Sequence, residues 1–66
     1  MEIVLNGQPR EIADGASVAA LLAATEYAQR KVAVEINREI VPRSQHAERR
    51  LHAGDRVEIV QAMGGG

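Results

Sequence analysis

The sequence GDRVEIVQAMGGG, residues 54–66, contains the strand and the tail around which the rest of the chain can be arranged. Alternation predicts a strand over residues 56–63, and its apolar residues fall on both faces, Val57 and Ile59 on one and Val60 and Ala62 on the other. A strand that is apolar on both faces is typical of the centre of a sheet. We therefore expect this last strand to be the central one.

Three glycines, Gly64, Gly65 and Gly66, follow this strand. Glycine loses more conformational entropy on ordering than any other residue and has no side chain to bury, so these residues are not expected in a packed core. The sequence predicts one domain over residues 1–63 and a flexible tail over residues 64–66. Such a tail reaches roughly 10 Å when extended, enough to thread a narrow channel while the domain docks outside.

Two segments before the helix predict a β-hairpin. Residues 2–6 and 9–13 read as strands, and Asn6-Gly7 between them accepts the positive φ values of a type I′ turn. Ser17 is the expected N-cap of a helix whose apolar residues recur at helical spacing, and this helix is predicted to end near Tyr27 or Ala28.

The middle of the chain predicts two further strands. Val32, Val34 and Ile36 alternate with polar or small residues, and a short strand at Ile40-Val41 is ended by Pro42. Residues 43–51 are expected to be irregular or to form one helical turn, with Leu51 pointing inward.

One helix covers only one face of such a sheet, which predicts an α+β roll. With a right-handed crossover and parallel pairing of the first and last strands, the fold class is a β-grasp (ubiquitin-like) roll. It has a mixed sheet of four to five strands and one main helix packed on one face.

Composition excludes several functions. The 66 residues include no cysteine, and two histidines in ordinary contexts do not indicate a metal site. A net charge of −1 with a single aromatic residue, Tyr27, gives no reason to expect nucleic acid. No membrane span or export signal is visible, so we expect a cytoplasmic domain that is a monomer when free.

The apolar residues opposite the predicted core form a candidate docking patch. Val4, Val60 and Ala62 are expected there, beside Met63 at the start of the tail. Single exposed hydrophobic residues are common on protein surfaces, but a domain without a pocket has to be recognised through its surface. The docking interpretation is therefore preferred.

The ordered set of motifs resembles the ThiS-type sulfur carrier proteins, which are ubiquitin-like β-grasp proteins of thiamine biosynthesis. The resemblance runs along almost the whole chain and ends in the diglycine Gly65-Gly66. The segments that show it are IVLNG (3–7), DGASVAALL (14–22), VAVEIN (32–37), IVPRS (40–44) and GDRVEIV (54–60). The third glycine, Gly64, exceeds the two that the family signature requires and lengthens the tail slightly.

This resemblance implies a mechanism centred on the carboxylate of Gly66. A ThiF-type enzyme would adenylate that carboxylate with ATP, and a relay drawing sulfur from cysteine would convert it to a thiocarboxylate. Thiazole synthase would then take the sulfur for the thiazole ring. The chain would be a protein co-substrate without turnover of its own, and it would bind no cofactor.

Two other functions use the same kind of tail. The small subunit of molybdopterin synthase shares the chemistry, although such proteins tend to be longer and to approach their diglycine differently. A ubiquitin-like modifier would instead form isopeptide bonds with lysines of other proteins. From the sequence we rank both of these functions below that of a thiamine sulfur carrier.

Overall fold

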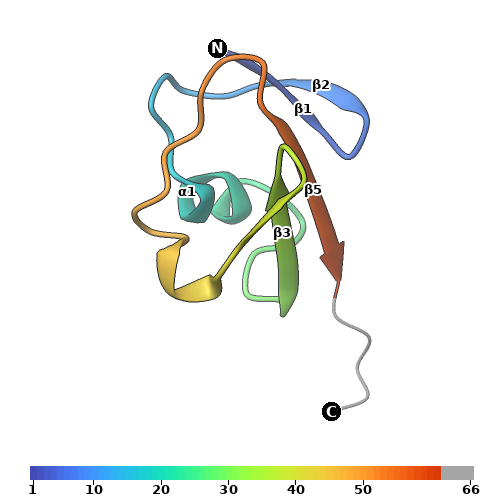
Figure 1. The fold of residues 1–66 in the computed structure, drawn as a ribbon, viewed down its shortest axis with the longest axis vertical. Helices are drawn as coiled ribbons and strands as arrows, with labels where there is room; N and C mark the ends of the chain where they lie inside the picture. Colours follow the sequence, from blue (N-terminus) through green and yellow to red (C-terminus); the bar gives the residue numbers. More distant parts are fainter. Residues whose placement is uncertain (62–66) are drawn as a thin grey trace.

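A computed structural model of the chain describes residues 1–61 (Figure 1). The predicted domain boundary at residue 63 and the predicted tail lie outside the described residues, as do Ala62 and Met63. The elements are β1 (Glu2–Leu5), β2 (Gln8–Glu11), α1 (Val18–Ala23), β3 (Val32–Ile36), β4 (Glu39–Val41), the 3₁₀ helix η1 (Arg43–Gln45) and β5 (Arg56–Gln61).

The last strand is the central one. The five-stranded sheet has the order β2-β1-β5-β3-β4, so β5 lies between the first strand and the third. It is parallel to β1, with Leu5 opposite Val57, and antiparallel to β3, with Val34 opposite Ile59. This arrangement confirms the predicted mixed sheet with parallel first and last strands.

Both hairpins have two-residue turns whose residues have positive φ. Asn6 and Gly7 have φ values of 49° and 81° between β1 and β2, as the sequence predicts. Asn37 and Arg38, at 51° and 70°, connect β3 to β4. The left-handed region suits asparagine and glycine far better than arginine, so Arg38 is the strained member of the four.

The helix begins where predicted and ends earlier. The Ser17 hydroxyl oxygen accepts a hydrogen bond from the Ala20 amide at 3.0 Å, which confirms the N-cap. The prediction that the helix reaches Tyr27 or Ala28 was wrong, because α1 stops at Ala23. The Leu22 carbonyl, which the amide of residue 26 would need, accepts instead from the Thr25 amide and hydroxyl at 3.0 and 2.8 Å.

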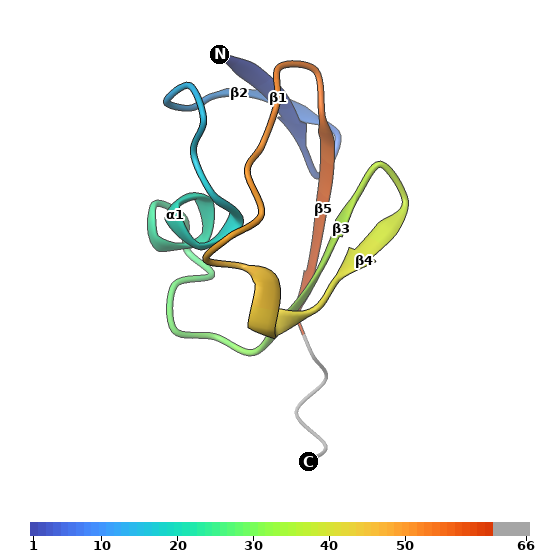
Figure 2. The same cartoon turned by 60° about the vertical axis from the view of Figure 1, so that its left-hand side comes forward.

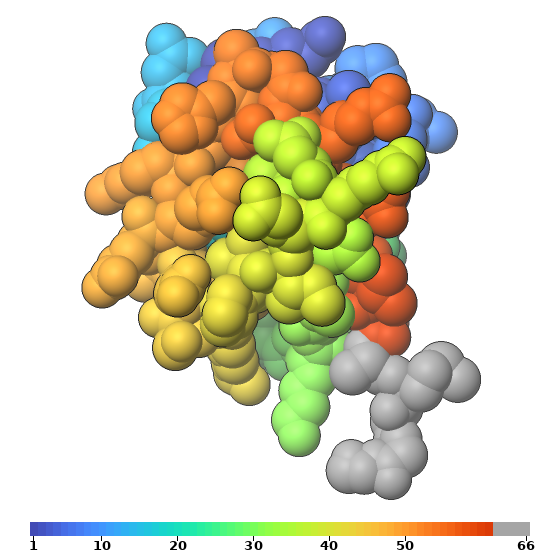
Figure 3. Space-filling model, viewed as in Figure 1, coloured from blue at the N-terminus to red at the C-terminus, as the bar shows by residue number. Residues whose placement is uncertain are grey.

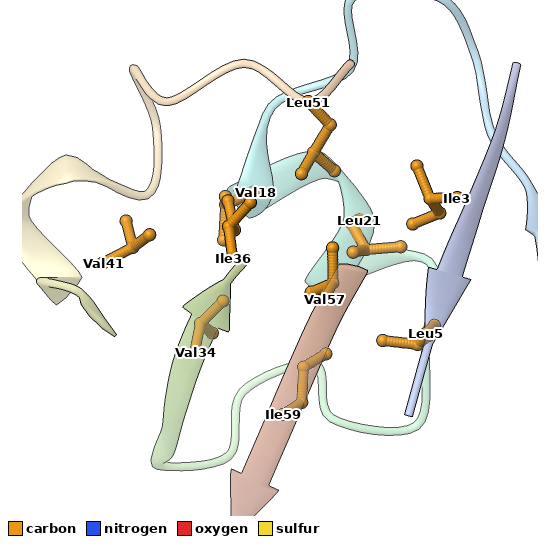
Figure 4. Close-up of a cluster of buried hydrophobic side chains, with 10 residues drawn as sticks. All are labelled: Ile3, Leu5, Val18, Leu21, Val34, Ile36, Val41, Leu51, Val57 and Ile59. Atoms are coloured by element: carbon orange, nitrogen blue, oxygen red, sulfur yellow. The ribbon is translucent and has the colours of Figure 1, made fainter. Parts of the chain in front are cut away.

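Helix and sheet form two layers around one core (Figure 2). The amphipathic face of α1 and the inward side chains of the sheet meet, with Leu51 closing the edge of the cluster (Figure 4). The buried hydrophobic residues are Ile3, Leu5, Val18, Leu21, Val34, Ile36, Val41, Leu51, Val57 and Ile59. The helix therefore covers only one face of the sheet, and the other face remains open.

The segment between β4 and β5 packs on the same side as α1. It contains the predicted single helical turn, η1, and it places Leu51 in the core at 1% exposure. Its backbone accepts from the start of the helix: the carbonyls of His46 and Arg49 lie 2.9 Å from the amides of Ala19 and Val18. These bonds satisfy helix amides that have no partner within the helix.

Asn6 joins the first hairpin to the central strand. Pairing of β1 with β5 ends as the chain turns at Asn6, so the amide of Ile59 has no further partner on the β1 backbone. The Asn6 side-chain oxygen accepts from that amide at 2.8 Å, and its nitrogen donates to the Tyr27 hydroxyl at 3.3 Å. One side chain thus extends the parallel ladder and ties it to the segment after α1.

Replacing Asn6 with alanine tests this role. The Asn6→Ala variant leaves the Ile59 amide without its hydrogen-bond acceptor. It also places alanine in the turn, and alanine tolerates a positive φ less well than asparagine does. We expect a loss of about 2 to 4 kcal/mol in the free energy of unfolding, measured with urea. Asn6→Asp, which keeps an acceptor oxygen and tolerates this φ, should lose less than half as much. Equal stability of wild type and Asn6→Ala would contradict the assignment.

Candidate functional site

The sheet face opposite α1 is the candidate functional surface, called here the open face. It is formed by the strand residues that alternate with the core residues. These are Glu2 and Val4 of β1, Pro9 and Glu11 of β2, Ala33 and Glu35 of β3, Ile40 of β4, and Arg56, Glu58 and Val60 of β5.

Two large apolar side chains are exposed on this face. Val60 is 58% exposed and Ile40 is 70% exposed. Ala33 stands directly opposite Val60, and Glu35, two residues further along β3, stands opposite Ile40. The β3–β4 hairpin lies beside β5 in the space-filling view (Figure 3). Val60 with its neighbour Ala33, and Ile40 on the far side of β3, are together called the apolar area, and Glu35 of β3 lies beside Ile40 within it.

Val4 belongs to the open face but not to this apolar area. It is half-buried and stands opposite Arg56, four residues before Val60 on β5. At about 3.3 Å per residue the two positions are about 13 Å apart along the strand, with Glu58 between them. The sequence placed Val4, Val60 and Ala62 in one patch; the structure separates the first two, and Ala62 lies outside the described residues.

Ile40 is the residue that the sequence analysis missed. The short strand was predicted, but no face was assigned to its two apolar residues. Alternation gives the answer once Val41, at 3% exposure, is known to point into the core. Its neighbour Ile40 must then point to the open face.

The exposed apolar residue Val60 lies next to the last described residue of β5. Gln61 ends β5 opposite Val32, and the Arg30 guanidinium donates to the Gln61 side-chain oxygen at 3.3 Å. Val60 directly precedes Gln61, so the exposed apolar area begins at the carboxyl end of the central strand. The predicted partner-binding residues Met63, Gly64 and Gly65, and the reactive Gly66, lie outside the described residues.

Five titratable side chains lie on the open face, and within residues 1–61 only Glu11 among them forms an ion pair; they are Glu2, Glu11, Glu35, Arg56 and Glu58. The Met1 ammonium lies 3.0 Å from an Asp14 carboxylate oxygen, and this hydrogen bond, helped by Glu11, raises the pKa of the ammonium above its ordinary value. The His46 ring Nε2 donates to the Val41 carbonyl at 3.1 Å on the helix side. Within residues 1–61 no group of three or more histidine, aspartate or glutamate side chains forms a candidate metal site.

A hollow of about 400 Å³ lies on the other side of the molecule. Leu22, Tyr27 and Val32 give it apolar walls, and Arg43 and His46 stand at its rim. Because it lies on the α1 side of the sheet, substitutions there and on the open face can be compared as separate surfaces. Along the described part of the chain, no helix is both long and apolar enough to cross a membrane.

A family model and curated relatives match nearly the whole chain. The model of the ThiS family matches residues 3–66. The sulfur carrier protein ThiS of Escherichia coli is 36% identical over 66 residues, and the alignment covers all of both chains. A thiazole synthase of Paramagnetospirillum magneticum is 46% identical over the same 66 residues, and one of Magnetococcus marinus is 38% identical.

The chain spans only a fifth of the length of those two synthases, 20% in each case. Among solved structures, the crystal structure of a thiamine biosynthesis protein (ThiS) from Geobacter metallireducens matches with a TM-score of 0.86 and 36% identity. The match covers all of both chains. It agrees with the predicted β-grasp fold.

Two valines on β5 test the assignment of the open face. Val57 is 1% exposed and Val60 is 58% exposed. Replacing valine with alanine therefore removes buried atoms at position 57 and solvent-exposed atoms at position 60. We expect Val57→Ala to lower the free energy of unfolding by about 2 kcal/mol, and Val60→Ala by less than about 0.5 kcal/mol. Chemical denaturation measures both. A similar loss in the two variants would show that Val60 is buried.

Proposed function

The chain belongs to the ThiS family, and on that premise we propose that it carries sulfur for the thiazole ring of thiamine. The observation that supports this most directly is the end-to-end match with a sulfur carrier of the same length. The family match extends to residue 66 and so includes Gly65-Gly66, which supports the proposal that the reaction takes place at this end.

The proposed reaction begins with activation of the Gly66 carboxylate. A carboxylate is a poor acyl donor because its oxygen is a bad leaving group and its charge repels nucleophiles. In the proposed step, a carboxylate oxygen attacks the α-phosphorus of ATP and pyrophosphate leaves, giving an acyl-adenylate. A ThiF-type activating enzyme would supply this step, so ATP is consumed on the partner.

Sulfur then replaces the adenylate. Hydrosulfide, whose sulfur is drawn ultimately from cysteine, attacks the acyl carbon through sulfur, and AMP leaves with the electrons of the broken C–O bond. The product is a thiocarboxylate that keeps reactive sulfur covalently attached until thiazole synthase uses it. The chain needs no cysteine of its own for this role, since the sulfur is bonded to the glycine carbonyl carbon.

The fold serves this chemistry by recognition. An extended glycine tail enters a narrow channel easily because it has no Cβ atoms, while a rigid domain provides the contact area. We propose that the open face is that contact area, since its exposed apolar residues begin next to the carboxyl end of β5. Partnership with thiazole synthase is supported by the two synthases that contain a region similar to the whole chain.

Intact mass spectrometry tests the function. After incubation with activating enzyme, ATP and a sulfur source, the protein should gain the mass that exchanges one oxygen for sulfur, located at Gly66. Deleting Gly66 should abolish this gain and leave the melting temperature nearly unchanged, because glycine contributes no buried side chain.

The controls separate the alternatives. Omitting ATP should prevent the mass change in the wild-type protein. Lysine-linked conjugates in place of the sulfur adduct would indicate a protein modifier, and a truncated protein that still acquires sulfur would refute the role of Gly66. Thiamine auxotrophy after loss of the protein would support the thiamine pathway. Loss of molybdenum cofactor would instead indicate the small subunit of molybdopterin synthase and contradict the proposal.

A second prediction concerns docking. Val60→Asp places a charge in the exposed apolar area and should lower kcat/KM for adenylation about tenfold or more, with the fold intact by circular dichroism. Ala47→Asp introduces the same charge in the exposed segment on the helix side and should leave adenylation unchanged. Full activity of Val60→Asp would remove Val60 from the interface.

A further inference from the structure

Two carboxylates of like charge stand directly opposite each other on the open face. Glu35 of β3 and Glu58 of β5 are cross-strand partners in the antiparallel register. The Cβ atoms of such partners lie about 4.5 to 5.5 Å apart, and like charges in this position destabilise a sheet. Glu35 is half-buried, and its partner on the other side is the exposed Ile40.

The described residues provide no ion pair for this couple. The ion pairs within residues 1–61 involve the Met1 ammonium with Glu11 and Asp14, and His52 with Asp55. Arg56 is the cation closest along the strand, two residues before Glu58 on the same face, yet it forms no ion pair with either glutamate. Within residues 1–61, no direct ion pair therefore offsets the repulsion between the two carboxylates.

This pairing contradicts what a free sheet prefers. β-Branched, aromatic or oppositely charged partners would stabilise the same position. Glu2 and Glu11 are a second pair of opposed carboxylates on this face, but both are exposed and Glu11 lies 3.4 Å from the Met1 ammonium. Glu35 is half-buried and forms no ion pair within residues 1–61, and a local conflict left without a partner charge indicates a functional constraint. Glu35 and Glu58 are also flanked by apolar side chains, Val60 with Ala33 on one side and Ile40 on the other.

We propose that thiazole synthase covers the open face and places a cationic side chain between Glu35 and Glu58, with apolar contacts on Val60 and Ile40. A guanidinium is the chemistry that fits best, because its planar fork donates to two carboxylates at once. This inference rests on the proposed function and adds the chemistry of the partner surface.

Two observations bear on the occupant, and the first of them favours the synthase. The similar region in the two synthase relatives belongs to the same chain as the rest of the synthase, and such linkage gives two surfaces a high effective concentration. The negative centre and apolar flanks of the face also require a partner of complementary charge. The cation would replace the repulsion between the glutamates with two charge-assisted hydrogen bonds.

The double variant Glu35→Gln with Glu58→Gln should raise the stability of the free protein and weaken its binding to thiazole synthase. In the free protein, removing the repulsion should raise the melting temperature by about 1 to 5 °C. Binding to thiazole synthase, measured by calorimetry, should weaken about tenfold, and the dependence of the Kd on salt should become shallower. If the two glutamates affected only the stability of the domain, the double variant would bind the synthase as tightly as the wild-type protein.

Two further variants complete the test. Glu48→Gln removes one negative charge from the exposed segment on the helix side and should change neither the melting temperature nor the Kd. Glu58→Lys pairs with Glu35 across the strands, so it should raise the melting temperature at least as much as the double variant and weaken binding further. Wild-type affinity in Glu58→Lys would overturn the inference.

The outcomes distinguish this inference from the function on which it rests. If the wild-type protein binds the synthase and the glutamine variants bind within twofold of it, the charge contact is wrong and the function stands. If the wild-type protein binds the activating enzyme but not the synthase, the synthase is wrong as the occupant. If no sulfur adduct forms and neither enzyme binds, both proposals fail.

Discussion

The parallel pairing of β1 with β5 is the interaction on which the rest of the structure depends. It joins residues near the two ends of the chain, with Val4 and Leu5 opposite Arg56 and Val57, and so brings together strands more than fifty residues apart in sequence. The chain-entropy cost of such a contact is offset only when the strand is buried and bonded on both edges. Pairing with β3 provides the second edge, and the Asn6 side chain extends the first by one bond.

A single short helix makes this sheet asymmetric. The six residues of α1, with the segment around η1, cover one face, and the ten buried hydrophobic residues gather there. Within residues 1–61 the other face is formed by strand side chains, so its character is set by the residues that alternate with the core. Exposed apolar residues and opposed carboxylates on that face are tolerable in a small domain because the core bears the stability.

The proposed chemistry follows the same division. A rigid central strand runs toward the residues that would react, and the proposed activation and sulfur transfer take place on the glycine carboxylate with enzymes supplying the catalytic groups. In this proposal the described domain contributes recognition, through Val60 near the carboxyl end of β5 and Ile40 of β4. In this proposal Val60, which contributes to recognition, and the Gly66 carboxylate, which reacts, are close in sequence but have different roles.

Local rules in the sequence determined the turns, the helix start and the strand pattern. Asn6-Gly7 specified its turn through positive φ, Ser17 specified the N-cap, and alternation in β3 and β5 specified which side chains are buried. The end of α1 was decided by Thr25, whose hydroxyl takes the Leu22 carbonyl, a competition that helix propensity does not reveal. Only the tertiary structure decided which exposed residues are neighbours, separating Val4 from Val60 and placing Glu35 between Glu58 and Ile40, because strand register is a property of the assembled sheet.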